Sequence, residues 1–342
     1  MSTTGTQPAQ PNQPDQPDQP DRTPRIVVGY DASAPAEVAV AWAAEEAARR
    51  GLPLVVMYAA DYTGLVGGPI STSPWVPGVS VDEARRIAER GAELARTTRP
   101  EVDARPATFV GSPGTVLIQE SEGTALVVVG TRGHGDVAGL LLGSVASRVA
   151  GHAHCPVVVA RGETAVIAGP DRPVVVGVDG SPAAGAALAA AVEQAQARGA
   201  ALRIVCAWVR TLPEGWDRAY WLAVDAEQDP DDTARAAAEN VAAEAAATAR
   251  GLAPGLAVET RVRSGDPAAV VLDAAGDAGL LVVGARGRGS LASLFLGSVS
   301  HGVVHGAHCP VLVVRAPAVK RAAAATGTAA TGAAAGVPAG LL

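Results

Sequence analysis

The stretch Ala125–Ser144, ALVVVGTRGHGDVAGLLLGS, decides how this chain is organised, because its pattern returns at Leu280–Ser298 as LLVVGARGRGSLASLFLGS. Each copy runs from an apolar segment into Gly-x-x-Gly, then nine residues, then Gly-Ser. A glycine loop of this kind can present backbone N–H groups to a phosphate where the chain enters a helix. The first loop glycines, Gly130 and Gly284, stand 154 positions apart (284 minus 130), so the pattern predicts two similar domains.

The similarity extends outward from the loops. Two pairs of segments match, Arg25–Ser33 with Pro173–Ser181 and Pro53–Ala59 with Leu202–Ala207. From the aspartate of the first segment to the first loop glycine, the first copy spans 99 residues (31 to 130) and the second spans 105 (179 to 284). We therefore expect six extra residues after the second strand of the second copy.

Domain boundaries follow from this repeat. We expect one domain at residues 25–161, a linker at 162–172 and a second domain at 173–316. Residues 1–24 are rich in Pro, Gln and Asp, and residues 317–342 are rich in Ala, Gly and Thr. Such compositions bury too little apolar surface to order a chain, so both ends are predicted to be disordered tails.

The order of elements in each copy predicts an α/β fold. Each reads strand, helix, strand, long loop, helix, strand, helix, strand, glycine loop, helix, strand. The expected strands are short and β-branched, as in a parallel sheet that is covered on both faces. Helices are expected at Ala34–Arg50 and Pro182–Arg198, with Gly51 and Gly199 at their C-caps. Alternating strands and helices indicate a doubly wound parallel sheet in each domain.

Composition and charge exclude several classes of partner. The net charge of −7 and the pI near 5.4 argue against a general nucleic-acid-binding protein. No apolar stretch reaches the roughly 18 residues of a membrane span, and no signal peptide is evident. Three cysteines, Cys155, Cys206 and Cys309, fit a reduced cytoplasm better than a disulfide framework. We expect a cytoplasmic protein with neither nucleic-acid nor membrane partners.

A second motif accompanies each glycine loop. The first strand of each copy ends in Gly-x-Asp-x-Ser, which makes Asp31, Ser33, Asp179 and Ser181 candidate ligand contacts. In open parallel sheets ligands bind beyond the carboxyl ends of the strands. If this end lies beside the glycine loop, a carboxylate and a phosphate cradle face one crevice, which suits a nucleotide. An Asx turn or a helix N-cap would give the same motif.

The loop glycines are expected to permit unusual backbone angles or a close approach of the ligand. The serine after the last glycine, Ser144 or Ser298, would add a hydroxyl at a helix start, where the helix dipole favours anions.

These motifs, together with the terminal Cys-Pro-Val strands, resemble the universal stress protein family in its tandem form, over about residues 25–316. The glycine pattern resembles that of the ATP-binding branch. The resemblance implies two five-stranded sheets of strand order 3-2-1-4-5, the adenine nucleotide alpha hydrolase-like fold, with ATP, with or without Mg²⁺, between strands one and four. It implies ribose and adenine contacts at Asp31, Ala59, Asp179 and Ala207. It implies phosphate contacts at Gly130, Gly133, Gly143, Ser144, Val145, Gly284, Gly287, Gly297, Ser298 and Val299.

The same resemblance implies pairing through the last strands, since family members commonly pair there in antiparallel fashion. Cys155–Ala160 and Cys309–Val314 can do so within one chain, as an intramolecular pseudo-dimer. An uncovered edge strand of valines would favour aggregation, so some cover is expected on physical grounds. Pairing of two chains into a homodimer stays open.

Three hypotheses about function remain. The sequence has no Gly-x-x-x-x-Gly-Lys-Ser/Thr motif, and its one lysine is Lys320. The first hypothesis is therefore a regulatory nucleotide-binding protein with no catalytic residue. The alternative is a slow ATP hydrolase or nucleotide transferase, with Asp31 and Asp179 holding Mg²⁺. A scaffold that binds nothing is the third. A metal site at His301 and His305, four positions apart, is weighed against a solvated helix face, and no metal is expected.

Overall fold

The computed structural model describes residues 24–60, 80–133, 142–163, 165–210, 230–287 and 296–316. The two predicted tails, apart from Pro24, lie outside these residues. Repeat 1 consists of β1 (Ile26–Gly29), α1 (Ala34–Arg50), β2 (Leu54–Ala60), α2 (Val81–Thr98), β3 (Ala104–Val110), α3 (Pro113–Glu120), β4 (Leu126–Gly130), α4 (Ser144–His152) and β5 (Val157–Ala160). Repeat 2 consists of β6 (Val174–Gly177), α5 (Pro182–Arg198), β7 (Leu202–Trp208), α7 (Pro230–Leu252), β8 (Val258–Ser264), α8 (Pro267–Ala274), β9 (Leu280–Gly284), α9 (Ser298–Gly306) and β10 (Val311–Val314).

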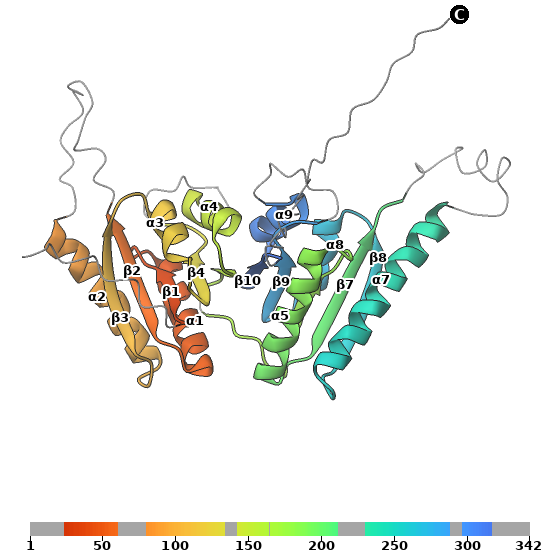
Figure 1. The fold of residues 1–342 in the computed structure, drawn as a ribbon, viewed down its shortest axis with the longest axis horizontal. Coiled ribbons are helices and arrows are strands. Elements are labelled where there is room, and N and C mark those ends of the chain that lie inside the picture. Colours follow the sequence, from red (N-terminus) through yellow and green to blue (C-terminus); the bar gives the residue numbers. More distant parts are fainter. Residues whose placement is uncertain are drawn as a thin grey trace, which may run out of the picture.

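The described strands form one ten-stranded sheet in the order β3-β2-β1-β4-β5-β10-β9-β6-β7-β8 (Figure 1). Neighbouring strands are parallel, with one exception at the centre, where β5 and β10 run antiparallel. Read from β3 to β5, and from β8 back to β10, each repeat has the order 3-2-1-4-5. The predicted fold class and strand order are therefore confirmed.

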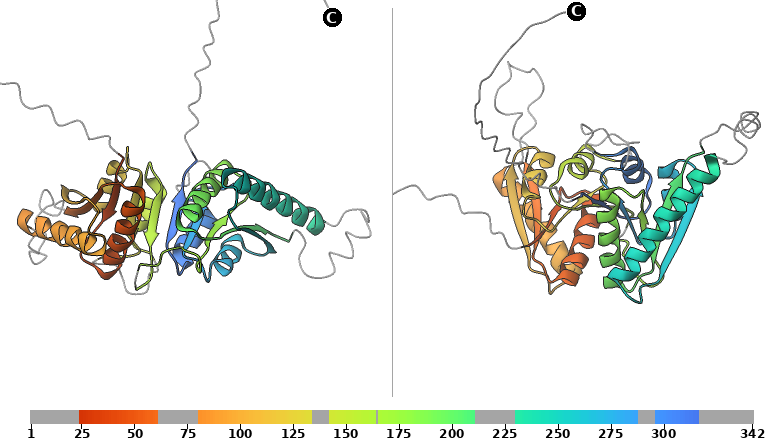
Figure 2. Two further views of the ribbon diagram at one scale, coloured as in Figure 1. Left: turned by 90° about the horizontal axis from the view of Figure 1, so that it is seen from below. Right: turned by 45° about the vertical axis from the view of Figure 1, so that its right-hand side comes forward.

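The pairing of β5 with β10, called the seam below, joins the two repeats. Val158 lies opposite Leu312 in an antiparallel register. Figure 2 shows the two strands side by side in the middle of the molecule. The predicted intramolecular pairing of the last strands is confirmed, and it covers the valine-rich edge that each repeat would otherwise expose.

Local sequence signals fix both ends of α1 and α5. The Ser33 hydroxyl accepts a hydrogen bond from the Ala36 N–H at 3.4 Å, and Ser181 caps α5 in the same way. At the other end Gly51 and Gly199 adopt left-handed backbone, with φ of 62° and 61°. Only glycine takes this conformation without a steric cost, so both helices end where the sequence predicts.

Each face of the sheet carries four of the described helices. Helices α1, α2, α5 and α7 cover one face and α3, α4, α8 and α9 the other (Figures 1 and 2). Their apolar residues form one packed layer on each face. The helices contribute mainly alanine and valine, and each apolar layer runs through both repeats. Small side chains let the helices lie close to the sheet, which explains how a chain with 3% aromatic residues is packed.

The six extra residues of repeat 2 do follow its second strand. Five of them lengthen a helix, since α7 has 23 residues and its counterpart α2 has 18. The connection before the helix accounts for one, with 21 residues between β7 and α7 (209–229) and 20 between β2 and α2 (61–80).

A buried carboxylate joins α1 to α5 across the two repeats. Glu46 has no exposed side-chain surface and accepts hydrogen bonds from Arg49 at 2.6 and 2.9 Å and from Arg198 at 2.6 Å. Gln194, which occupies the position of Glu46 in repeat 2, donates to it at 3.0 Å. Burial alone would raise the pKa of Glu46, but Arg49, Arg198, Arg50 and Gln194 together lower it to about 2.

Candidate functional site

The aspartate after the first strand and the glycine loop after the fourth lie against each other in both repeats. Asp31 Oδ1 accepts the Ser33 N–H at 3.0 Å, which forms an Asx turn. Its second oxygen faces Gly133 so closely that a Cβ built there would lie 2.3 Å from Oδ2. Asp179 and Gly287 repeat this arrangement, with 2.6 Å between the corresponding positions. Each crevice therefore has a carboxylate next to its glycine loop.

Above the carboxylate, the loop leads into a helix whose N-cap is a glycine. Gly143 is the N-cap of α4 and Gly297 that of α9, and neither helix has a side-chain cap hydrogen bond within the described residues. The first N–H groups of a helix have no partner inside it. At α1 a serine satisfies one of them, whereas at α4 and α9 they remain for another acceptor, which makes these helix starts suited to an anion.

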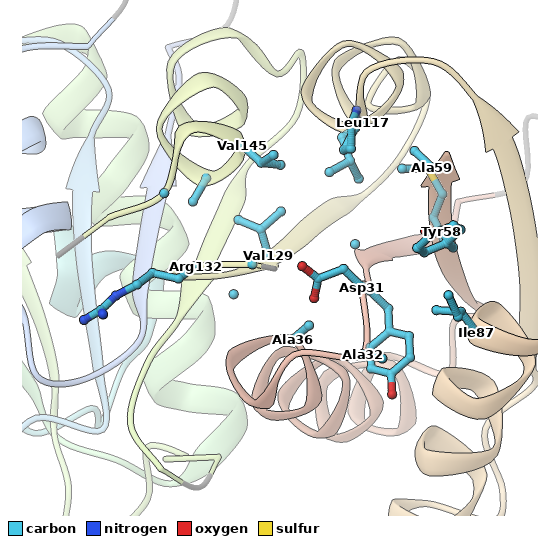
Figure 3. Close-up of a pocket in the computed structure, with 18 of the residues that line it drawn as sticks. Asp31, Ala32, Ala36, Tyr58, Ala59, Ile87, Leu117, Val129, Arg132 and Val145 are labelled. Atoms are coloured by element: carbon cyan, nitrogen blue, oxygen red, sulfur yellow. The ribbon is translucent and has the colours of Figure 1, made fainter. Parts of the chain in front are cut away.

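A cavity of about 600 Å³ lies between these parts in repeat 1 (Figure 3). Figure 3 shows the Asp31 carboxylate on its floor, Val145 and Leu117 above it, and Ala59 and Ile87 at one side. The predicted site residues that line it are Asp31, Ala59, Gly130, Gly133, Gly143, Ser144 and Val145.

Repeat 2 has an equivalent cavity of about 330 Å³. The predicted site residues that line it are Asp179, Ala207, Gly284, Gly287, Gly297, Ser298 and Val299. Fold and sequence motif thus bring the same types of residue together twice.

Ser33 and Ser181 stand apart from the other candidates. Neither is among the residues that line the cavities. Their hydroxyls accept the capping hydrogen bonds of α1 and α5, so the alternative interpretation of the Asp-x-Ser motif, an Asx turn followed by an N-cap, describes these two serines.

The described loop glycines do not adopt unusual backbone angles. Among Gly130, Gly133, Gly143 and their counterparts in repeat 2 none has a positive φ, and Gly143 and Gly297 have ordinary extended N-cap values of −77° and −67°. A Cβ on Gly130 would lie 2.6 Å from the Pro35 carbonyl oxygen, and one on Gly284 would lie 2.8 Å from the Ala183 carbonyl carbon. These two glycines let a strand end pack against the start of α1 or α5. Of the two expected roles, unusual angles are not found at these six glycines, and a close approach of the ligand stays a prediction.

One wall of the first cavity was not found from the sequence. Glu83, Ile87 and Arg90 of α2 line it, together with Tyr58 of β2. The three α2 residues are spaced i, i+4 and i+7, which places them on one helical face. That spacing was available as a signal, but the sequence alone does not show which face of α2 meets the crevice.

None of the described cysteines and histidines lines either of the two cavities. Burial raises the pKa of Cys155 to about 12 and that of Cys309 to about 11, so neither thiol is a nucleophile at neutral pH. The rings of His301 and His305 lie 4.3 Å apart. In the part of the chain that the structure describes, no group of three or more His, Cys, Asp or Glu side chains is arranged to hold a metal.

Comparison with known proteins agrees with the duplicated architecture. The profile of the universal stress protein family matches residues 23–161 and again 172–315. The chain belongs to the universal stress protein family. Universal stress protein Rv2623 of Mycobacterium tuberculosis (strain ATCC 25618 / H37Rv) is 34% identical over 304 residues, which cover 85% of this chain and 96% of that protein.

Two solved structures illustrate the range of likeness. A universal stress protein from Archaeoglobus fulgidus DSM 4304 covers 86% of this chain and 98% of its own, with 20% identity and a TM-score of 0.56, and so shares the fold. A universal stress protein solved in complex with cAMP covers 43% of this chain and 98% of its own, with 27% identity and a TM-score of 0.33. None of the helices in the described ranges is long and apolar enough to cross a membrane.

Proposed function

We propose that this universal stress protein binds ATP in each repeat and acts as a nucleotide-dependent regulator in a stress response. The observation that carries the proposal is the pair of glycine-capped helix starts, α4 and α9, each above a carboxylate at the edge of a cavity. The phosphates would accept hydrogen bonds from the N–H groups of the first helical turn, and the hydroxyl of Ser144 or Ser298 would be a further donor.

The remaining lining residues support a nucleoside at the other end of each cavity. Asp31 or Asp179 can accept hydrogen bonds from ribose hydroxyls, and Ala59 or Ala207 lies beyond it at the end of the second strand. In repeat 1 Ile87 and Leu117 give that end of the cavity apolar surface, beside Glu83 and Arg90, and apolar surface suits the face of a base. The choice of adenine follows from the resemblance of the glycine pattern to that of the ATP-binding branch.

The proposal can be tested by titrating the full chain with ATP in a calorimeter. We expect two sites in the natural protein, and Gly297→Ala should weaken one of them at least tenfold, the loss of about one hydrogen bond to a charged group. A Cβ at Gly297 finds its nearest atom at 3.4 Å, so the protein itself accommodates the methyl group, whereas an incoming phosphate would meet it.

Gly185→Ala is the matched control, because it adds the same methyl group to repeat 2 in open space on α5. It should leave both sites unchanged. If the natural protein binds no ATP, or if Gly297→Ala binds as the natural protein does, the assignment of the glycine loops is wrong.

The alternative function is slow ATP hydrolysis or nucleotide transfer. Its support is the position of Asp31 and Asp179 beside the loops, where each carboxylate could contribute one ligand to Mg²⁺. Release of phosphate under single-turnover conditions separates the two ideas. Turnover no faster than once in several hours would rule out a catalytic role. A cytoplasmic location belongs to the same proposal, and three free, buried thiols are compatible with a reducing compartment.

A further inference from the structure

Each repeat places an arginine pair where its glycine loop meets the seam. Arg132 follows β4 and Arg161 follows β5, and repeat 2 has Arg286 and Arg315 at the same positions. Figure 3 shows the Arg132 side chain extending away from Asp31 toward the ribbon of repeat 2. The pairs therefore lie beside the candidate nucleotide pockets, on the side that faces the other repeat.

The outer arginine of each pair reaches across the seam. An Nη of Arg161 donates to the Val304 carbonyl oxygen at the end of α9, and an Nη of Arg315 donates to the Gly151 carbonyl oxygen at the end of α4. Arginine commonly binds the last carbonyls of a helix in this way. Each of these hydrogen bonds uses one Nη of its guanidinium group.

One guanidinium nitrogen in each pair, the Nε of Arg161 and the Nε of Arg286, is buried without a hydrogen-bond partner among the described residues. Within the described residues, buried side-chain nitrogens without a hydrogen-bond partner are the Nε atoms of Arg25, Arg99, Arg161 and Arg286. Arg25 and Arg99 are nevertheless ion-paired, with Glu120 and Glu45 respectively. For Arg161 and Arg286 the described residues supply no such carboxylate.

Like charges face each other within each pair. Burial lowers the pKa of Arg161, the neighbouring Cys309 acts in the opposite direction, and the positive charge of Arg132 lowers it further. Burial and the charge of Arg286 act in the same direction on Arg315. No described Asp or Glu side chain shifts the pKa of Arg161 or Arg315. A partly buried cation beside a second cation, as Arg161 is beside the exposed Arg132, is stabilised when an anion lies between the two.

The structure also provides a space for such an anion. A third cavity of about 340 Å³, the seam cavity, is lined by Pro35, Thr131, Arg132, Arg161, Gly162 and, from repeat 2, Ala307 and His308. Thr131 and Arg132 also line the candidate nucleotide pocket of repeat 1, so these two cavities share a wall. An anion in the seam cavity would lie between Arg132 and Arg161 of repeat 1 and Ala307 and His308 of repeat 2.

We propose that the arginine pairs at the seam form a phosphate site shared by the two repeats, which takes the terminal phosphate of a nucleoside polyphosphate or a free phosphate group. Guanidinium groups hold phosphate through two parallel hydrogen bonds, which is the chemistry that these positions offer. In its nucleotide form the inference rests on the proposed function. The seam then distinguishes ATP from AMP.

The test compares AMP, ATP and inorganic pyrophosphate on the full chain at one ionic strength. Calorimetry should give tighter binding of ATP than of AMP to the natural protein. In Arg161→Gln/Arg315→Gln the ratio of the two affinities should fall about tenfold or more, the effect of losing a charge-assisted hydrogen bond, while AMP binding stays unchanged. Arg132→Gln, at an exposed side chain whose loss does not endanger folding, should lower the ratio in the same direction.

Arg250→Gln is the control, since it removes the same charge from an exposed position on α7. It should not alter the ratio. If the seam variants keep the natural ratio while AMP and ATP still bind, the inference is wrong and the proposed function stands.

If neither nucleotide binds, the proposed function is wrong, and pyrophosphate decides the inference by itself. The shared site predicts that pyrophosphate raises the melting temperature of the natural protein and of Arg250→Gln, and that it does not raise that of the seam variants. The absence of any rise in the natural protein would overturn the inference.

Discussion

The two repeats share the frame of the site and differ in its walls. Strand order, the Asp-glycine contact and the glycine-capped helix are the same in both. The first cavity measures about 600 Å³ and the second about 330 Å³, and α2 lines the first while no described residue of α7 lines the second. The end of the site at the glycine loop is therefore duplicated, whereas the end beyond the second strand has diverged. Under the proposed function, we do not expect equal ATP affinity in the two repeats.

The same comparison holds at the contact between α1 and α5. Glu46 and Gln194 occupy equivalent positions, but only the first carries a charge, and the neighbour Arg49 is replaced by Ala197 in repeat 2. One carboxylate thus serves arginines from both repeats. Two carboxylates at this place would repel each other, and none would leave buried guanidinium groups unpaired.

We expect the largest effect from removing the single carboxylate at the contact between α1 and α5. Glu46→Gln should lower the free energy of unfolding by about 3 kcal/mol at pH 7, because it leaves Arg49 and Arg198 without their anion and because a pKa depressed from 4.5 to about 2 corresponds to a similar energy. Urea denaturation measures the loss. Glu46→Gln/Gln194→Glu returns one carboxylate and should recover part of it, but not all, since residue 197 offers no guanidinium.

The same variant has a pH signature. Folding lowers the pKa of Glu46, so its carboxylate stabilises the protein fully above pH 4.5, and this contribution is lost as the pH falls toward 2. The difference in unfolding free energy between the natural protein and Glu46→Gln should therefore stay constant from pH 7 to 5 and shrink from pH 4.5 downward. A difference independent of pH would show that the charge of Glu46 is not the source of the stability.

A smaller effect sharpens the comparison of the pockets. Under the proposed function, Ile87→Ala should weaken ATP binding to the site of repeat 1 about fivefold, since about 1 kcal/mol of apolar contact with the base is lost. Val241→Ala is the matched variant on α7, where Val241 stands at the position of Ile87 but lies outside the second pocket. Two-site calorimetry should show no change for it. Equal effects of the two variants would contradict the different base ends.

The smallest expected effect concerns the residue between the aspartate and the capping serine. Ala32 has a φ of +64°, in the left-handed region, and repeat 2 has Gly180 there with a φ of +77°. Gly180→Ala should destabilise the protein by about 1 kcal/mol, and Ala32→Gly should stabilise it by about the same or less, because the entropy of the unfolded chain partly offsets the relief of strain. Thermal unfolding of the two variants checks the opposite signs.

The sequence predicted those features that short segments determine. A serine one or two positions before a proline marks the start of α1 and of α5, and a glycine marks the end of each. The spacing of the glycine loops predicted the duplication. The strand order and the pairing of β5 with β10 came from the resemblance to a family, because no local pattern specifies which strands are neighbours. Ser33 shows the limit of a local motif, since an Asp-x-Ser sequence is compatible both with a ligand site and with a helix N-cap.

What could not be predicted depends on contacts between distant segments. Which face of α2 lines the cavity depends on how the helix is oriented about its own axis, and the sequence does not specify this orientation. Arg161 contacts Val304 only because the two repeats are joined at the seam. The role of Gly130 likewise depends on how closely α1 approaches β4. Each of these contacts links residues that no sequence spacing relates.

The antiparallel join of β5 and β10 has a consequence for the protein in a cell. Two separate chains that met through these strands would come apart on dilution, so their paired fraction would follow the level of expression. A covalent connection gives the two strands an effective concentration on the order of millimolar, whatever the abundance of the protein. The arrangement of the two repeats is therefore set by the chain itself, and what remains variable is the supply of ligand.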